Sequence, residues 1–232
     1  MTFAEKVIRF NKQLQYTGAP LPAGIRVLNP FIENPEALKV STAFYKKYYS
    51  DTQPRHLILG INPGRFGAGL TGVPFTDPKR LINECGIPYQ GKLTHEPSSV
   101  FVYEMIHAFG GIKAFYEKFY INSLCPLGFT SVDAAGREKN YNYYDSPALI
   151  AAVKVYIIEN IRKQIAMGTV PGICFCLGLG KNIAFLQKLN KEHYFFDTII
   201  PLEHPRFIVQ YKNKSIQSYI DKYVNAFRSV TG

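Results

Sequence analysis

The sequence is poor in cysteine, with four among its 232 residues, and no two of them form a C-x-x-C pair. Zinc sites and cysteine-held iron–sulfur clusters usually depend on such closely spaced pairs, so we predict neither a metal site nor a cofactor. Cys174 and Cys176 lie in the apolar run GICFCLGLG. That setting is typical of buried thiols that pack as small hydrophobic side chains.

The sequence also lacks an apolar run near the roughly 20 residues that a membrane-spanning helix requires. Its N-terminus, MTFAEKVIRFNKQL, carries charges throughout and has no apolar core of a secretory signal. With 47% hydrophobic and 19% charged residues, the composition is not that of a disordered chain. These absences predict a folded, cytoplasmic protein without a membrane partner.

Acidic residues are scarce as well, because 17 Asp and Glu face 27 Lys and Arg, which gives a formal charge of +10. An excess of positive charge favours polyanionic partners, with nucleic acid first and anionic membrane second. A basic composition is also common among ordinary soluble proteins, so the charge alone leaves the partner open.

Short apolar runs alternate with longer amphipathic ones, the pattern of βαβ units in a parallel sheet covered by helices. Without an internal repeat or a linker, the whole chain (1–232) is expected to form a single α/β domain, with N-terminal helices in residues 1–50 packed on it. The expected strands are 55–61, 118–123, 172–177 and 195–202. The expected helices are 3–15, 35–49, 98–109, 147–166, 181–191 and 215–227, and Ser146-Pro147 is a typical helix start.

The segment after the first strand contains most of the candidate chemistry. Asn62-Pro63-Gly64 turns sharply at the carboxyl end of that strand, which presents Asn62 at the crevice where α/β proteins bind ligands. Asn-Pro and Pro-Gly pairs also occur in ordinary turns, so these three residues alone do not indicate a site.

The longer stretch HLILGINPGRFGAGLTGVPF, residues 56–75, resembles the first motif of the uracil-DNA glycosylase superfamily. The pattern G-[MI]-N-P-G-x-F-G followed by T-G-V-P-F belongs to its single-strand-selective monofunctional (SMUG-type) branch. The residues in register are Gly60, Asn62, Pro63, Gly64, Phe66, Gly67, Thr71, Gly72, Val73, Pro74 and Phe75. The resemblance implies a three-layer α/β/α sandwich with a central four-stranded parallel sheet, in agreement with the four expected strands.

A second motif, YINSLCPLGF, ends another expected strand at residues 120–129. An asparagine at a strand end is often only a turn former. SMUG-type enzymes carry an N-x-C-P-L segment whose asparagine recognises the uracil edge, and Asn122, Cys125, Pro126 and Leu127 are similar to it. The resemblance therefore implies that Asn122 recognises the base.

A third motif, EHPRF, follows the last expected strand, at residues 203–207. A lone histidine there is often structural. The superfamily has H-P-S-P-R or a close variant at this place; His204 and Pro205 match, but Arg206 follows at once. This departure implies a divergent, SMUG2-like subtype with an altered duplex wedge, for which Arg206 is the candidate.

The segment GLGKN, residues 178–182, lacks the spacing of a Walker loop or of a Rossmann glycine motif. We expect it to begin a helix that offers amides and Lys181 to a DNA phosphate. Arg65, Arg206, Lys212 and Lys214 are further candidate contacts with the DNA backbone. A solvated helix face would explain the basic residues after His204 equally well.

Together these resemblances imply a monomeric enzyme, acting in the bacterial-type nucleoid, that flips uracil or a related deaminated or oxidised base out of DNA. Phe75 would stack on the base, Asn122 would recognise it, His204 would stabilise charge on its O2, and Asn62 would hold the attacking water. The other residues expected to contact the substrate are Gly60, Ile61, Gly64 and Phe66. No lysine lies in these motifs, so the expected reaction is hydrolysis to an abasic site.

Two other functions remain open at this stage. The altered third motif is compatible with a catalytically weak or silent DNA-binding module that keeps the glycosylase fold. A nucleotide-binding enzyme would use the glycine-rich loops, although both spacings fail for it.

Overall fold

The computed structural model describes residues 1–133 and 135–231. Its centre is a four-stranded parallel sheet of β2 (Arg55–Gly60), β3 (Phe119–Ser123), β6 (Thr169–Leu177) and β7 (Thr198–Leu202), in the order β3-β2-β6-β7. All four predicted strands are confirmed. β2 is buried along its whole length, which explains why Leu57, Ile58 and Leu59 form an apolar run without alternation.

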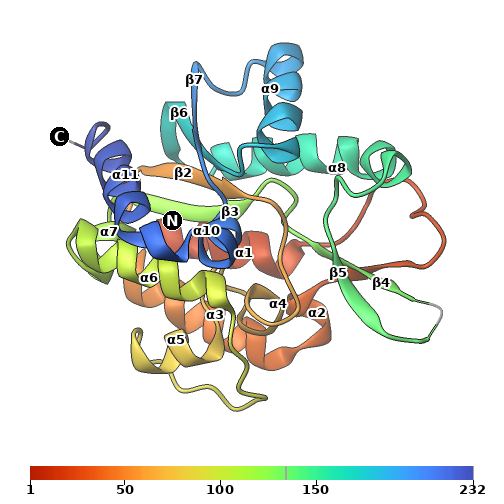
Figure 1. The fold of residues 1–232 in the computed structure, drawn as a ribbon, viewed down its shortest axis with the longest axis horizontal. Coiled ribbons are helices and arrows are strands. Elements are labelled where there is room, and N and C mark those ends of the chain that lie inside the picture. Colours follow the sequence, from red (N-terminus) through yellow and green to blue (C-terminus); the bar gives the residue numbers. More distant parts are fainter. Residues whose placement is uncertain (134, 232) are drawn as a thin grey trace.

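Helices cover both faces of this sheet, so the α/β/α sandwich is confirmed (Figure 1). On one side lie α8 (Pro147–Ile165) and α9 (Lys181–His193), and on the other α6 (Pro97–Phe109) and α11 (Ile216–Arg228). The ring of Phe227 on α11 lies 4.7 Å from that of Phe119 and 4.8 Å from that of Phe175, so it joins α11 to β3 and β6.

The N-terminal helices α1 (Phe3–Gln13) and α3 (Pro35–Tyr48) also pack on the sheet. The rings of Phe3, Tyr45 and Tyr49 surround Tyr120 of β3 at 5.2, 6.4 and 6.1 Å. All six predicted helices are present within two residues of their expected ends. The predicted cap of α8 is confirmed, because the Ser146 hydroxyl accepts a hydrogen bond from Leu149 N at 3.1 Å. None of the described helices is long and apolar enough to cross a membrane.

A second, antiparallel sheet was not predicted. It consists of β1 (Ile25–Leu28), β4 (Gly128–Val132) and β5 (Glu138–Tyr141), and it projects to one side of the molecule (Figure 1). β5 is largely exposed and polar, so it has no apolar run that would predict a strand. The other unpredicted elements are short: α2 (Pro30–Glu33), α4 (Ala68–Thr71), α5 (Pro78–Asn83), α7 (Ile112–Tyr116), α10 (Pro205–Tyr211) and the 3-10 helix η1 (Asn213–Ser215).

The chain that leaves β5 is fixed to the parallel sheet by a buried hydrogen bond. The Tyr143 hydroxyl donates to Asn182 Oδ1 at 2.8 Å, and Asn182 Nδ2 donates to the carbonyl of Leu177, the last residue of β6, at 3.0 Å. Asn182 thus anchors the small sheet to the end of a central strand.

We expect Tyr143→Phe to lower the free energy of unfolding by about 1–2 kcal/mol, because it leaves the buried Asn182 oxygen without its donor. Urea unfolding would measure the change. Tyr194→Phe is the matched control, since the Tyr194 side chain is 86% exposed. Equal stability of the two variants would contradict the anchoring role.

Candidate active site

A concave site lies where the carboxyl ends of the parallel strands meet. From β2 the chain passes to β3 on one side of β2, and it later returns to form β6 on the other side. Such a reversal of strand order opens a crevice in α/β sheets. A cavity of about 510 Å³, here called the main cavity, occupies it. Its lining is Ile61, Asn62, Pro63, Gly64, Ala68, Pro74, Phe75, Glu96, Ser98, Ser123, Asn140, Asn142, Tyr144, His204, Arg206, Phe207, Gln210 and Tyr211.

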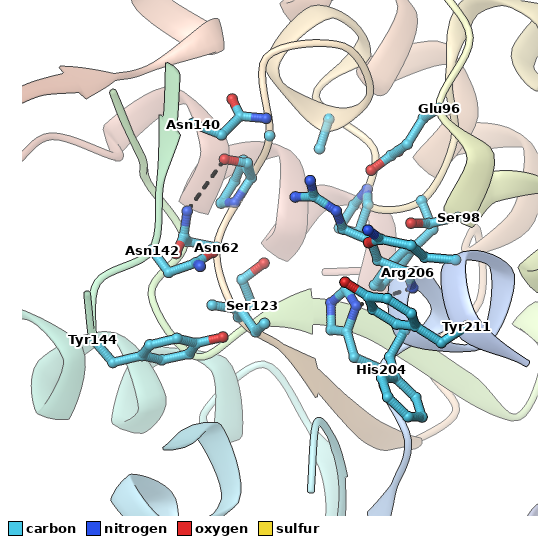
Figure 2. Close-up of a pocket in the computed structure, with 18 residues that line it drawn as sticks. Asn62, Glu96, Ser98, Ser123, Asn140, Asn142, Tyr144, His204, Arg206 and Tyr211 are labelled. Carbon is cyan, nitrogen blue, oxygen red and sulfur yellow. Dashed lines mark hydrogen bonds between the residues drawn. The ribbon is translucent and has the colours of Figure 1, made fainter. Parts of the chain in front are cut away.

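The structure therefore brings together residues from all three predicted motifs. Asn62 and Tyr144 lie on one side, Arg206 and His204 on the other, and Ser123 lies between them (Figure 2). The predicted site residues that line the main cavity are Ile61, Asn62, Gly64, Phe75, His204 and Arg206. Asn140, Asn142 and Tyr144 come from β5 and the residues after it, which sequence analysis could not place because it did not detect that sheet.

The side-chain amide of Asn62 is held by backbone atoms of the segment after β5. Its Nδ2 donates to the Tyr141 carbonyl at 3.2 Å, and its Oδ1 accepts from Tyr143 N at 3.1 Å. The backbone N–H identifies Oδ1 without ambiguity, so the orientation of the amide is fixed. Asn62 keeps one oxygen lone pair for a further donor, such as a water molecule.

Phe75 presents its ring beside His204, with the two ring centroids 5.7 Å apart. Its backbone has a φ of 53°, in the left-handed region that non-glycine residues seldom adopt. Such strain tends to be kept at functional sites. Gly60 does not line the main cavity; it is buried at the end of β2, where a Cβ would lie 3.5 Å from the Phe75 ring.

His204 is a neutral hydrogen-bond donor in this geometry. Its Nδ1 accepts from Arg206 N at 3.2 Å. Burial, with the positive charge of Arg206 as a second cause, lowers the pKa of His204 to about 4. A neutral imidazole whose Nδ1 accepts must carry its proton on Nε2. His204 can therefore donate from Nε2 without being charged at neutral pH.

Asn122 does not line the main cavity, contrary to the expectation from sequence. Its Nδ2 donates to the Tyr120 hydroxyl at 2.7 Å, and its Oδ1 accepts from Ser123 N at 2.8 Å. It borders an inner cavity of about 20 Å³ that shares Pro63, Ala68 and Pro74 with the main one.

Ser123 lines the main cavity instead of its neighbour. A signal for this was present in the sequence: the family pattern N-x-C-P-L has one residue before the cysteine, whereas Ser123 and Leu124 both separate Asn122 from Cys125. Counted back from Cys125, Ser123 occupies the place of the pattern's asparagine. The backbone of Ser123 is fixed on both sides, because its carbonyl also accepts from Gln164 Nε2 at 3.3 Å.

Glu96, which the sequence analysis did not select, also faces the main cavity. Its Oε2 is buried without a hydrogen-bond partner among the described residues, and it lies where a Cβ on Gly67 would be. Burial raises the pKa of Glu96 to about 7; the negative charge of Asp77 adds to this and Arg206 opposes it. A glutamate surrounded by neutral residues in the linear sequence gives no sign of such burial.

The other predicted DNA contacts lie around the cavity. The Arg65 guanidinium pairs with Glu138 at 3.1 Å and covers the Phe66 ring at 5.0 Å. Phe66 borders a second cavity. Lys181 begins α9 and lies 5.8 Å from the Tyr144 ring, at a side cavity of about 430 Å³ that also reaches His204.

Lys212 and Lys214 are exposed beyond α10 and do not line the main cavity. In the described part of the chain, His, Cys, Asp and Glu side chains form no group of three or more that could hold a metal ion.

We expect Glu96→Gln to change stability in a pH-dependent way. The folded protein holds the Glu96 proton up to about pH 7, whereas an unfolded glutamate releases it near pH 4.3. The wild type should therefore lose stability relative to the variant as pH rises from 5 to 8, by up to about 3 kcal/mol. Urea unfolding at both pH values would measure this, with the exposed Glu104→Gln as control. A stability difference between wild type and Glu96→Gln that is the same at both pH values would contradict it.

Known proteins resemble this chain in sequence and in fold. The family model of the uracil DNA glycosylase superfamily matches residues 46–228. No curated protein matches the chain. Among solved structures, the crystal structure of wild-type Pedobacter heparinus SMUG2 is 65% identical, with a TM-score of 0.98 over 100% of this chain and 99% of that one. The resemblance inferred from the motifs is thereby confirmed, and the chain belongs to the uracil-DNA glycosylase superfamily.

Proposed function

We propose that the protein removes uracil from DNA by hydrolysing the N-glycosidic bond, which leaves an abasic site. The observation that carries the proposal is the pairing of a fixed amide, Asn62, with a neutral imidazole donor, His204, across one cavity. The family and the similarity to SMUG2 support a glycosylase of this type.

The base must leave the duplex or strand before the reaction, because its glycosidic carbon is not accessible within the stack. The main cavity, at about 510 Å³, has room for a nucleobase. Phe75 would stack on the flipped base, since every base offers a π-face. The positive φ of Phe75 supports this role, because such backbone strain tends to be kept at functional sites.

Ser123 is proposed to contact the polar edge of the base. A hydroxyl can donate or accept, so Ser123 would match O4 or N3–H of uracil, although less strictly than an amide. Asn122 is then a positioning residue, because its Oδ1 holds the backbone N–H of Ser123.

The chemistry follows from the protonation states. Water held by Asn62 attacks C1′ of the sugar, the C1′–N bond breaks, and its electron pair leaves with the uracil anion, which takes up the proton that the water releases. His204 Nε2 donates to O2 as negative charge grows there. An amide does not titrate, so Asn62 orients the water. The described residues that line the main cavity include no lysine, which supports hydrolysis without a covalent Schiff base.

Arg206 and Lys181 are proposed to contact DNA phosphates beside the flipped nucleotide. They lie near the main and side cavities, respectively, and His204 borders both. The proposed binding is electrostatic and therefore sensitive to salt.

The direct test uses a uracil-bearing oligonucleotide, alkaline treatment after incubation and detection of strand breaks, with a thymine oligonucleotide as control. Breaks at uracil only would support the proposal. DNA binding without breaks would identify a catalytically silent module and overturn it.

We expect His204→Ala and Asn62→Ala to fold and to lower the single-turnover rate of uracil excision. Loss of a donor at a developing oxyanion typically costs about 10²–10³ in rate, and we expect that range for His204→Ala. Asn62→Ala should also lower the rate and, because its amide holds Tyr141 and Tyr143, should reduce stability. Rates within about threefold of wild type for either variant would contradict the assigned roles.

We expect Ser123→Ala to lower uracil excision by about tenfold, because a lost hydrogen bond is worth about 1 kcal/mol or somewhat more. Asn122→Ala should have a similar effect if Asn122 acts by positioning Ser123, and the double variant should then be little worse than either single one. The exposed Ser218→Ala is the control. Full activity of Ser123→Ala would show that the base is recognised elsewhere.

A further inference from the structure

A second cavity of about 490 Å³, here called the neighbouring cavity, adjoins the main one. The two share six lining residues: Gly64, Glu96, Ser98, Asn140, Arg206 and Gln210. A nucleotide bound in the main cavity is joined to the next nucleotide by a single phosphate. The neighbouring cavity is therefore within reach of the adjacent part of the same strand.

The walls of the neighbouring cavity suit a nucleobase. Phe66, Pro97 and Val209 provide apolar surface. The Phe66 side chain is 46% exposed although it is aromatic. The Arg65 guanidinium lies 5.0 Å from the ring centroid, and Thr94 Oγ1 donates to the backbone carbonyl of Phe66 at 2.6 Å. A partly exposed aromatic ring in a cavity is the usual platform for base stacking.

Polar groups surround this apolar surface. Asn140 Oδ1 accepts from Arg65 N at 3.1 Å, which leaves its Nδ2 as a donor at the cavity wall. The Gln210 amide and the Arg206 guanidinium lie on the same wall. Amides and guanidinium groups match the hydrogen-bonding edges of bases, and Arg206 adds a charge that suits the linking phosphate.

The carboxyl of Glu96 is the one acidic group that lines the neighbouring cavity among the described residues. A fully ionised carboxylate would oppose a nucleic-acid ligand. Burial raises the pKa of Glu96 to about 7, so part of the population carries a neutral carboxyl at neutral pH. His95, half-exposed at the same wall, lies 3.5 Å from the buried Asp77 carboxylate.

We propose that the neighbouring cavity binds the base next to the flipped nucleotide on the same strand, with Phe66 as its stacking surface. This inference rests on the proposed function. It predicts that the enzyme recognises its substrate by two adjacent bases of one strand, one in each cavity.

The test uses single-stranded oligonucleotides with one uracil, in which the nucleotide on either its 5′ or its 3′ side is replaced by an abasic tetrahydrofuran residue. Single-turnover excision at varied enzyme concentration gives the half-saturating concentration and the maximal rate. For the wild type, removal of the base on one side should raise the half-saturating concentration about five- to a hundredfold. The maximal rate should change little.

Phe66→Ala should raise the half-saturating concentration on the complete oligonucleotide to a similar degree, and the abasic replacement should have no further effect in that variant. Phe66→Leu, which keeps an apolar side chain, should give an intermediate loss. Tyr194→Ala is the control, because it removes an exposed aromatic residue that borders neither cavity.

An unchanged half-saturating concentration with either base missing would overturn the proposal, as would an equal abasic effect in the wild type and in Phe66→Ala. If Phe66→Ala does not fold, the abasic replacements in the wild type still decide. Failure of the proposed function is a separate result, namely no excision from the complete uracil oligonucleotide.

Discussion

The side-chain amide of Asn62 is the contact on which the geometry of the site depends. It follows β2 of the parallel sheet and bonds through both of its polar atoms to the chain that leaves the small antiparallel sheet. That chain is fixed in turn through Tyr143 and Asn182 to the end of β6. One series of hydrogen bonds therefore positions Asn62 together with Asn140, Asn142 and Tyr144, which form the same wall of the main cavity.

Burial determines the charge of the main cavity. The same physical cause lowers the pKa of His204 and raises that of Glu96, because a medium that excludes water disfavours both charged forms. The imidazole is thus neutral at pH 7 and the carboxyl only partly ionised. Arg206 is the one permanent charge on the described lining of the main cavity. A polyanion can approach a site of this kind without meeting a fixed negative charge.

The strands of the parallel sheet could be predicted from the sequence, and so could the positions of Asn62 and His204 at the main cavity. Both β2 and β7 contain apolar runs, although β2 is buried along its whole length and β7 is partly exposed. The residues that follow these runs, Asn62 and His204, could therefore be placed at one sheet edge. The antiparallel sheet could not be predicted, because Leu28 pairs with Gly128 across a hundred residues and β5 is polar. Tertiary contacts of that kind have no local pattern.

The strand end that contributes Ser123 to the main cavity shows a different limit. Asn122 and Ser123 are adjacent, and successive residues of a strand point to opposite faces. An error of one position in matching a motif therefore assigns the wrong side chain to the cavity. The spacing to Cys125 matches Ser123 to the asparagine of the pattern, whereas the residue type alone matches Asn122. Neither motif spacing nor residue type indicated Glu96, because its side chain becomes buried only when α6 and the loop after β2 come together.

The absence of a side chain at Gly67 affects which residue can stand at position 96. A side chain at this position would need space that another residue already occupies. The required space is that of the Glu96 carboxyl, which lies where a methyl group on residue 67 would be. Positions 67 and 96 share one volume, so we expect them to vary together among related chains. In such relatives, a side chain at 67 would accompany a shorter or uncharged residue at 96.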